Sequence, residues 1–69
     1  MITHVMAMLK VVENPIQYLD SLNIPYSVRK IEPFDPLNPY KFYAILIEYK
    51  DIKYIVHYRI IDGKWSYVQ

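Results

Sequence analysis

Apolar and polar side chains alternate along the C-terminal part of the chain, a period-2 pattern that predicts β-strands. Three runs are rich in β-branched and aromatic residues: 41–49 (KFYAILIEY), 52–61 (IKYIVHYRII) and 64–68 (KWSYV). The breaks between them are Lys50-Asp51 and Asp62-Gly63, and two-residue breaks are typical of antiparallel hairpins. Asp-Gly tolerates the positive φ angles of a type I′ turn, so the second turn is the better supported. We therefore predict a β-meander over residues 41–68.

Two-residue loops fix which residues lie opposite one another, and alternation then divides the side chains of the meander between two faces. The first, named the aromatic face, holds Tyr43, Ile45, Ile47, Tyr49, Ile52, Tyr54, Val56, Tyr58, Ile60, Trp65 and Tyr67. The second, named the reverse face, holds Phe42, Ala44, Leu46, Glu48, Lys53, Ile55, His57, Arg59, Ile61, Lys64, Ser66 and Val68. Glu48 lies opposite Lys53 in this register, an opposite-charge pair that supports it. The aromatic face has an aliphatic centre, with tyrosines toward margins where their hydroxyls reach water. It is the expected core, on which the short helix of residues 14–23 would pack.

Residues 14–23 carry both a start signal and a stop signal for a short helix. Asn14 is a favourable N-cap, and Pro15 occupies the first helical position, where its missing N–H costs nothing. Asn23 can adopt the left-handed conformation that ends a helix, with Ile24 making the accompanying hydrophobic contact. The sequence therefore predicts a helix between these two asparagines.

Residues 1–13 fit either a helix or a strand. Met, Ala, Leu and Lys favour a helix, whereas the valines also suit a strand, and periodicity does not decide for so short a run. We favour a helix capped by Thr3, which extends the helical prediction over residues 3–22 with a kink near Pro15. The inward stripe of its first part would be Val5, Met8, Leu9 and Val12.

Residues 26–31 (YSVRKI) predict a fourth strand, at an edge of the sheet because Arg29 and Lys30 lie together in it. Residues 32–40 (EPFDPLNPY) are a proline-rich crossover with proline at every third position, the period of a polyproline II helix, which would lay prolines against aromatic side chains. We predict one α+β domain over residues 1–69, an N-terminal helical part packed on a three- to four-stranded antiparallel sheet.

Size and composition favour self-association. A chain of 69 residues buries only about 60% of its unfolded surface, and without cysteine it has no disulfide or cysteine-ligated metal to stabilise it. An apolar fraction of 54% with 16% aromatic residues is high for this length. Five prolines and a single glycine are a composition that would suit a protein from a hot habitat.

No apolar run is long enough to span a bilayer and no signal-peptide pattern is present, so we expect a soluble intracellular protein.

No constellation of catalytic residues is visible in the sequence. His4 and His57 are the only histidines, there is no thiol, and the serines lie in no nucleophile motif. No glycine-rich loop could hold a phosphate, and the histidines match no metal-ligand spacing. We therefore expect no enzyme activity, no cofactor, no metal and no small-molecule substrate, and we interpret His57 as a half-exposed sheet residue.

The reverse face is the candidate binding surface because it holds more apolar residues than a solvated sheet face does. Either the N-terminal segment or a second molecule covers it, and cations around an apolar patch are typical of a protein–protein contact. The predicted partner-binding residues are Phe42, Leu46, Lys53, Ile55, His57, Arg59, Ile61, Lys64 and Val68. We expect a small regulatory or interaction protein that forms a homodimer or binds another protein, and that does not bind a membrane.

Nucleic-acid binding through Lys53, Arg59 and Lys64 is the alternative. A net charge of +1 gives the whole chain no general attraction to nucleic acid. Phe42 is the only aromatic residue assigned to the same face as these cations, so the sheet would separate most of the stacking surface from the charge.

Overall fold

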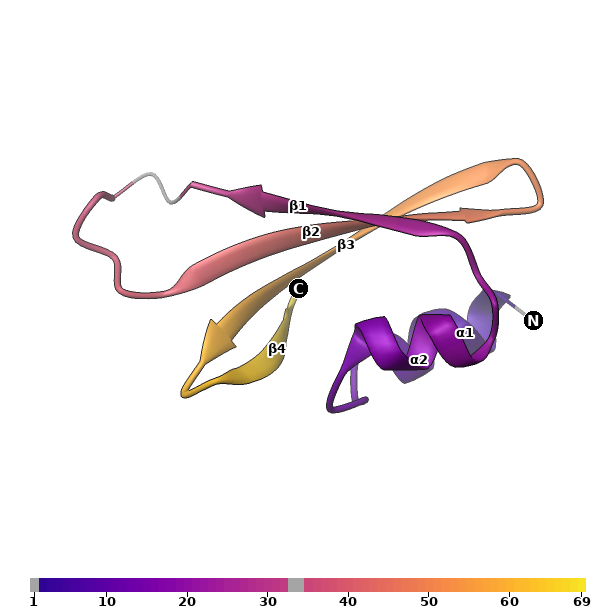
Figure 1. The fold of residues 1–69 in the computed structure, drawn as a ribbon, viewed down its shortest axis with the longest axis horizontal. Coiled ribbons are helices and arrows are strands. Elements are labelled where there is room, and N and C mark those ends of the chain that lie inside the picture. Colours follow the sequence, from indigo (N-terminus) through magenta and orange to yellow (C-terminus); the bar gives the residue numbers. More distant parts are fainter. Residues whose placement is uncertain (1, 33–34) are drawn as a thin grey trace.

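The sheet expected from the alternating pattern is present, with its strands in the antiparallel order β1-β2-β3-β4. The computed structural model describes residues 2–32 and 35–69. Its elements are α1 (Ile2–Leu9), α2 (Pro15–Ser21), β1 (Tyr26–Ile31), β2 (Lys41–Tyr49), β3 (Ile52–Ile61) and β4 (Lys64–Val68). Figure 1 shows both helices on the same side of the sheet. The chain is therefore a small α+β fold with one helical layer and one sheet layer, as predicted.

The meander β2–β3–β4 has the predicted register. Every cross-strand pair inferred from the two-residue loops is formed, including Glu48 opposite Lys53. The φ angles of the turns are 51° at Lys50, 64° at Asp51, 51° at Asp62 and 76° at Gly63. Positive φ at both central residues is the type I′ conformation, whose twist matches that of the flanking strands. Both turns therefore have this form, although only the second contains glycine.

β1 has the predicted bounds and lies at an edge of the sheet, hydrogen-bonded to β2. Arg29 lies opposite Ala44 and Ile31 lies opposite Phe42. This register assigns Tyr26, Val28 and Lys30 to the aromatic face and Ser27, Arg29 and Ile31 to the reverse face. From here on the two face names include these residues.

The helical prediction for residues 3–22 needs a correction at residues 10–14, which form a turn between two separate helices. The cause is local, since a residue that precedes proline is disfavoured in the helical region. Asn14 is extended instead (φ −138°, ψ 103°), and its side-chain oxygen accepts hydrogen bonds from the N–H groups of Ile16 at 3.0 Å and Gln17 at 3.2 Å. Asn14 is thus the N-cap of α2, as predicted. Helix α1 is also confirmed over the strand alternative, but it begins at Ile2, so Thr3 is not its cap.

The end of α2 is the predicted left-handed termination. Asn23 has φ 55°, and its N–H donates to the carbonyl of Asp20 at 3.1 Å. The N–H of Ile24 donates to the carbonyl of Leu19, also at 3.1 Å. This pair of bonds is a Schellman motif, and Ile24 and Leu19 join the same buried cluster. The motif turns the chain from the helical layer into β1.

The core lies between the helices and the aromatic face. Its buried members are Val5, Leu9, Leu19, Ile24, Ile45, Ile47, Val56 and Tyr58. Of the predicted inward stripe of α1, Val5 and Leu9 are buried, whereas Met8 and Val12 are only half-buried. All sheet residues of the cluster belong to the aromatic face, so both helices cover that face.

Tyr58 departs from the expectation that tyrosines lie at wet margins. Its side chain is 1% exposed, and its hydroxyl donates to the carbonyl of Leu9 at 2.6 Å. That carbonyl lies at the end of α1, where no helical N–H is available to it. Burial, and to a lesser degree the neighbouring Tyr67, raises the pKa of Tyr58 well above its ordinary value. The hydroxyl therefore stays protonated and ties α1 to β3.

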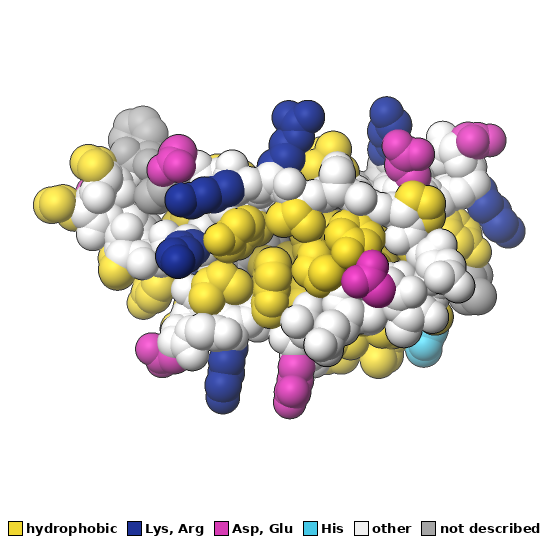
Figure 2. Space-filling view, in the orientation of Figure 1, with side chains coloured by type: hydrophobic (Ala, Val, Ile, Leu, Met, Phe, Trp, Pro, Cys, Tyr) yellow, Lys and Arg dark blue, Asp and Glu magenta, His cyan; other side chains and the backbone are white. Residues whose placement is uncertain are grey.

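The helical layer reaches only the start of β1, where the Tyr26 hydroxyl donates to the carboxylate of Asp20 at 2.9 Å. Val28 points to the aromatic face from this edge strand and remains exposed. Figure 2 shows a belt of hydrophobic side chains across the middle of the molecule, between the strands and the helices. The core is thus partly open along this side.

The described part of the crossover is a turn, not a continuous polyproline II segment. The N–H of Asn38 donates to the carbonyl of Asp35 at 3.0 Å. The side chains of Asp35 and Asn38 accept hydrogen bonds from the N–H groups of Leu37 and Tyr40, each at 2.9 Å. These local bonds compete successfully with an extended backbone. Of the two prolines expected to pack on aromatic side chains, Pro36 is exposed and Pro33 lies outside the described residues.

Candidate interaction surface

The reverse face has no helix packed on it, because α1 and α2 both lie on the opposite side of the sheet (Figure 1). Ile55 is 56% exposed on this face, on the part of β3 that extends beyond its pairing with β4. Leu46, directly opposite it on β2, is half-buried, as is Phe42. Such apolar exposure on an open sheet face is unusual, since antiparallel sheets ordinarily turn polar residues toward water.

Every residue predicted to bind a partner lies on this one face. Along β2 these are Phe42 and Leu46; along β3 they are Lys53, Ile55, His57, Arg59 and Ile61; along β4 they are Lys64 and Val68. Leu46 with Ile55 and Phe42 with Ile31 form two apolar pairs on the face, and the row between them contains Arg29, Ala44, His57 and Val68. Cations therefore lie within the apolar surface as well as around it.

Sequence reasoning missed Arg29, which extends the positive charge of the reverse face to its β1 edge. The strand residues of the face now include Arg29, Lys53, Arg59 and Lys64, against Glu48 as their single acidic residue. Half of the chain's eight Lys and Arg residues thus share a face with one of its seven Asp and Glu residues. The face is strongly positive on a chain whose net charge is +1.

Sequence reasoning also missed Tyr40, which lies near these cations. Phe42 is therefore not the only aromatic residue beside them, as the sequence had indicated. The guanidinium carbon of Arg59 lies 5.7 Å from the centroid of the Tyr40 ring, within cation–π range. Tyr40 is 40% exposed, and Phe42 lies directly opposite Arg59 in the β2–β3 register. Two aromatic rings and a planar cation are therefore neighbours at one end of the reverse face.

A hollow of about 560 Å³ lies between this end of the face and the crossover. It is lined by Ile31, Glu32, Asp35, Asn38, Phe42, Tyr43, His57, Tyr58 and Val68. Glu32 and Asp35 place carboxylates at the crossover side, and the Glu32 carboxylate lies 3.9 Å from the Lys30 amino group. Acidic residues thus border the cationic face on the crossover side.

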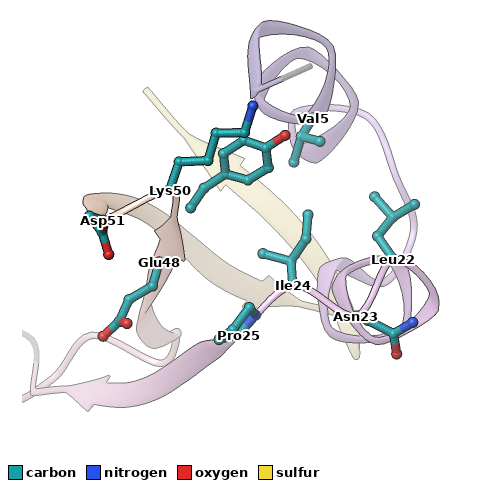
Figure 3. A pocket seen from close by; sticks show the side chains of 9 residues that line it. Val5, Leu22, Asn23, Ile24, Pro25, Glu48, Lys50 and Asp51 are labelled. Carbon is teal, nitrogen blue, oxygen red and sulfur yellow. The ribbon is translucent and has the colours of Figure 1, made fainter.

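A second hollow, of about 480 Å³, lies between the helices and the β2–β3 turn. Figure 3 shows Val5, Leu22 and Ile24 on one side of it, while the carboxylates of Glu48 and Asp51 point away from them. The acidic groups at this hollow therefore do not converge on a common point.

The side chains of the described residues that could bind a metal ion do not gather at one place. Among residues 2–32 and 35–69, no group of three His, Cys, Asp or Glu side chains is placed to hold a metal ion. His57 is exposed, and its cross-strand neighbours are Ala44 and Val68, so no carboxylate lies opposite it. Neither α1 nor α2 has the length and apolar character that a membrane-spanning helix needs.

Comparisons with known proteins identify no relative: no family model, no curated protein and no solved structure matches this chain. Function is therefore inferred from the reverse face itself.

Proposed function

We propose that this chain is a small, non-enzymatic protein that acts by binding another macromolecule through the reverse face, and that it self-associates there as a homodimer when no partner is present. The observation that carries the proposal is the apolar surface around Ile55, left open although both helices are packed on the other face. Such a protein would regulate its partner by occupying a surface of it. An intracellular location and an origin in a hot habitat are part of this proposal, supported by composition alone.

Burial of the open apolar side chains supplies the driving force for association. Complete transfer of an isoleucine side chain out of water is worth about 1.5–3 kcal/mol. Ile55 is 56% exposed, so covering it would contribute about 1 kcal/mol. In a two-fold symmetric dimer both copies contribute the same patch, so each such contact occurs twice. The half-buried Leu46 and Phe42 add smaller contributions.

The positive charge of the reverse face opposes this self-association. Two copies that meet face to face bring Arg29, Lys53, Arg59 and Lys64 of each near the same residues of the other. Salt screens repulsion between exposed charges, with a Debye length of about 10 Å at 0.1 M. We therefore expect a dimer that strengthens as the salt concentration rises.

Sedimentation equilibrium or light scattering at low and high salt tests the dimer. We expect a mass approaching twice 8.3 kDa at high salt for the wild type, and a monomer for Ile55→Glu. Val11→Glu is the matched control, because Val11 is 73% exposed but lies outside the sheet. A wild type that stays monomeric at every salt concentration, or an Ile55→Glu variant that dimerises normally, would rule out self-association through this face.

Nucleic acid is the second candidate partner. The face assignments made from the sequence counted against nucleic-acid binding, since they put the cations and most of the aromatic residues on different faces. Arg29 and the Tyr40–Arg59 contact favour it, because they add a cation and an aromatic ring to the reverse face. An oligonucleotide shift at low salt that is lost with Arg59→Ala tests this candidate.

A further inference from the structure

We infer that the reverse face binds a single-stranded nucleic acid, with bases stacked at Tyr40, Phe42 and Arg59 and phosphates held by Arg29, Lys53 and Lys64. This inference rests on the proposed function, in which the reverse face is the working surface. It goes further by naming the chemical class of the partner.

Charge complementarity is the first argument. The charged strand residues of the face are cations except for Glu48, which lies opposite Lys53. A second copy of the chain meets this surface with the same sign, whereas a polyanion meets it with the opposite sign. The binding of cations to phosphates also releases condensed counterions, which contributes favourably at low salt.

Stacking geometry is the second argument, and it distinguishes a nucleic acid from an acidic protein. Arg59 lies opposite Phe42 and has its guanidinium carbon 5.7 Å from the centroid of the Tyr40 ring. Aromatic rings and guanidinium planes are the surfaces on which unpaired bases stack in sheet-based binders. A carboxylate-rich peptide has no comparable flat group to place there.

The layout of the charges suggests the path of the strand. Lys53 and Arg59 are both on β3, about 20 Å apart at the usual rise per residue. Glu32 and Asp35 border the hollow beside Ile31 and would repel phosphates from the crossover side. The backbone therefore follows β3 from the β2–β3 turn toward β4, leaving room for about two or three bases on the aromatic residues.

A duplex fits this surface poorly. Its bases are paired and stacked on one another, so Tyr40 and Phe42 could reach them only after unpairing. The open sheet is also broader than the single helix or two-stranded ribbon that enters a major groove. Single strands should therefore bind more tightly than a duplex of the same length.

Fluorescence anisotropy tests the inference directly, with labelled oligouridylate and oligothymidylate of about twelve nucleotides, a hairpin duplex and an oligoglutamate peptide. We expect single strands to bind at about 50 mM salt and to weaken steeply by about 200 mM, with the duplex at least tenfold weaker. No single-strand binding at low salt would overturn the inference. So would oligoglutamate that binds as tightly as the oligonucleotides.

Substitutions separate charge from stacking. Arg59→Ala should reduce affinity about tenfold or more, whereas Lys10→Ala, which removes the same charge beyond the end of α1, should change it little. Tyr40→Ala should also cost about tenfold but leave the salt slope unchanged, because it removes stacking alone. Arg59→Lys should keep the salt slope and lose affinity, because lysine has no planar group. Equal losses for Lys10→Ala and Arg59→Ala would overturn the assignment to this face.

Self-association through the reverse face and nucleic-acid binding there can be tested independently. Salt-strengthened dimers that Ile55→Glu abolishes, together with no oligonucleotide binding, would reject a nucleic-acid partner while leaving the reverse face as an interaction surface. The absence of both would reject both.

Discussion

The two faces of the sheet are built from the same strands and end in opposite situations. Ile45 and Val56 are almost fully buried beneath the helices on the aromatic face. Their immediate neighbours along the chain, Leu46 and Ile55, lie on the reverse face without a helix over them. Since consecutive residues of a strand point to opposite sides, apolar runs in β2 and β3 make both faces apolar.

The difference shows what the N-terminal helices can and cannot do. Together they are short, and both are required to bury the aromatic face, with Tyr58 fixing α1 to β3. The reverse face keeps apolar side chains interspersed with cations, which is the composition of an interface more than of a solvated sheet. The sheet is thus covered by helices on one side and has no helix over it on the other.

The largest expected effect falls on the covered face. Leu19→Ala removes a fully buried side chain from α2, a change that typically costs about 2–5 kcal/mol. That is a large part of the stability of so small a domain. Ile55→Ala, on the open face, should cost less than about 1 kcal/mol in dilute protein. Urea denaturation followed by circular dichroism measures both, and equal costs would contradict the contrast between the faces.

The next largest effect should come from the hydrogen bond between Tyr58 on β3 and the carbonyl of Leu9 on α1. Tyr58→Phe removes the hydroxyl and leaves the buried carbonyl of Leu9 without its donor, which should lower the free energy of unfolding by about 1–3 kcal/mol. Tyr40→Phe removes a hydroxyl from a residue on the open side and serves as the control. Thermal or urea unfolding compares the two, and a neutral Tyr58→Phe would mean that this bond does not stabilise the helical layer.

High pH should lower the free energy of unfolding through Tyr58, which lies on the covered face. Burial raises the pKa of Tyr58, so the unfolded chain loses this proton near pH 10 while the folded chain keeps it. The contribution of Tyr58 to stability is therefore complete below about pH 10 and declines as the pH rises above that value. Unfolding midpoints across this range should fall more steeply for the wild type than for Tyr58→Phe. Parallel pH profiles would contradict the buried, protonated state.

The smallest effects concern the turns, which keep the two faces distinct by fixing the register. Gly63→Ala places a side chain at φ 76° with no atom near it, so its cost of about 1 kcal/mol is purely conformational. Replacing Lys50-Asp51 with Asn-Gly should stabilise the first turn by about 0.5–1 kcal/mol, because both residues have positive φ. Calorimetry can resolve both shifts, and a destabilised Asn-Gly variant would argue against the type I′ form.

Alternation and turn length were sufficient to predict the meander and the membership of its two faces. Each hairpin loop has only two residues, so it leaves the register no freedom. The signals at Asn14, Pro15 and Asn23 were equally local, and they predicted α2 correctly. Residues 1–13 were ambiguous because their helical stripe is short and rich in valine, so packing against the sheet decides their structure.

What sequence reasoning missed depends on contacts between distant segments. Arg29 was not assigned to the reverse face because the long crossover leaves the register of β1 against β2 undetermined. Tyr40 precedes the strand pattern, so its place beside Arg59 follows from the crossover turn. The burial of Tyr58 depends on a carbonyl 49 residues away in sequence. None of these pairings has a periodic signature.

Thiol accessibility gives the most direct measurement of the central claim, that the reverse face is open in the single chain and closed by a partner. The chain has no cysteine, so Ile55→Cys and Val11→Cys each introduce one reactive group. In dilute protein both should react rapidly with a thiol reagent. At high concentration in high salt, or with bound oligonucleotide, only Ile55→Cys should become protected. Slow modification of Ile55→Cys in dilute protein, or no protection under any of these conditions, would contradict the account.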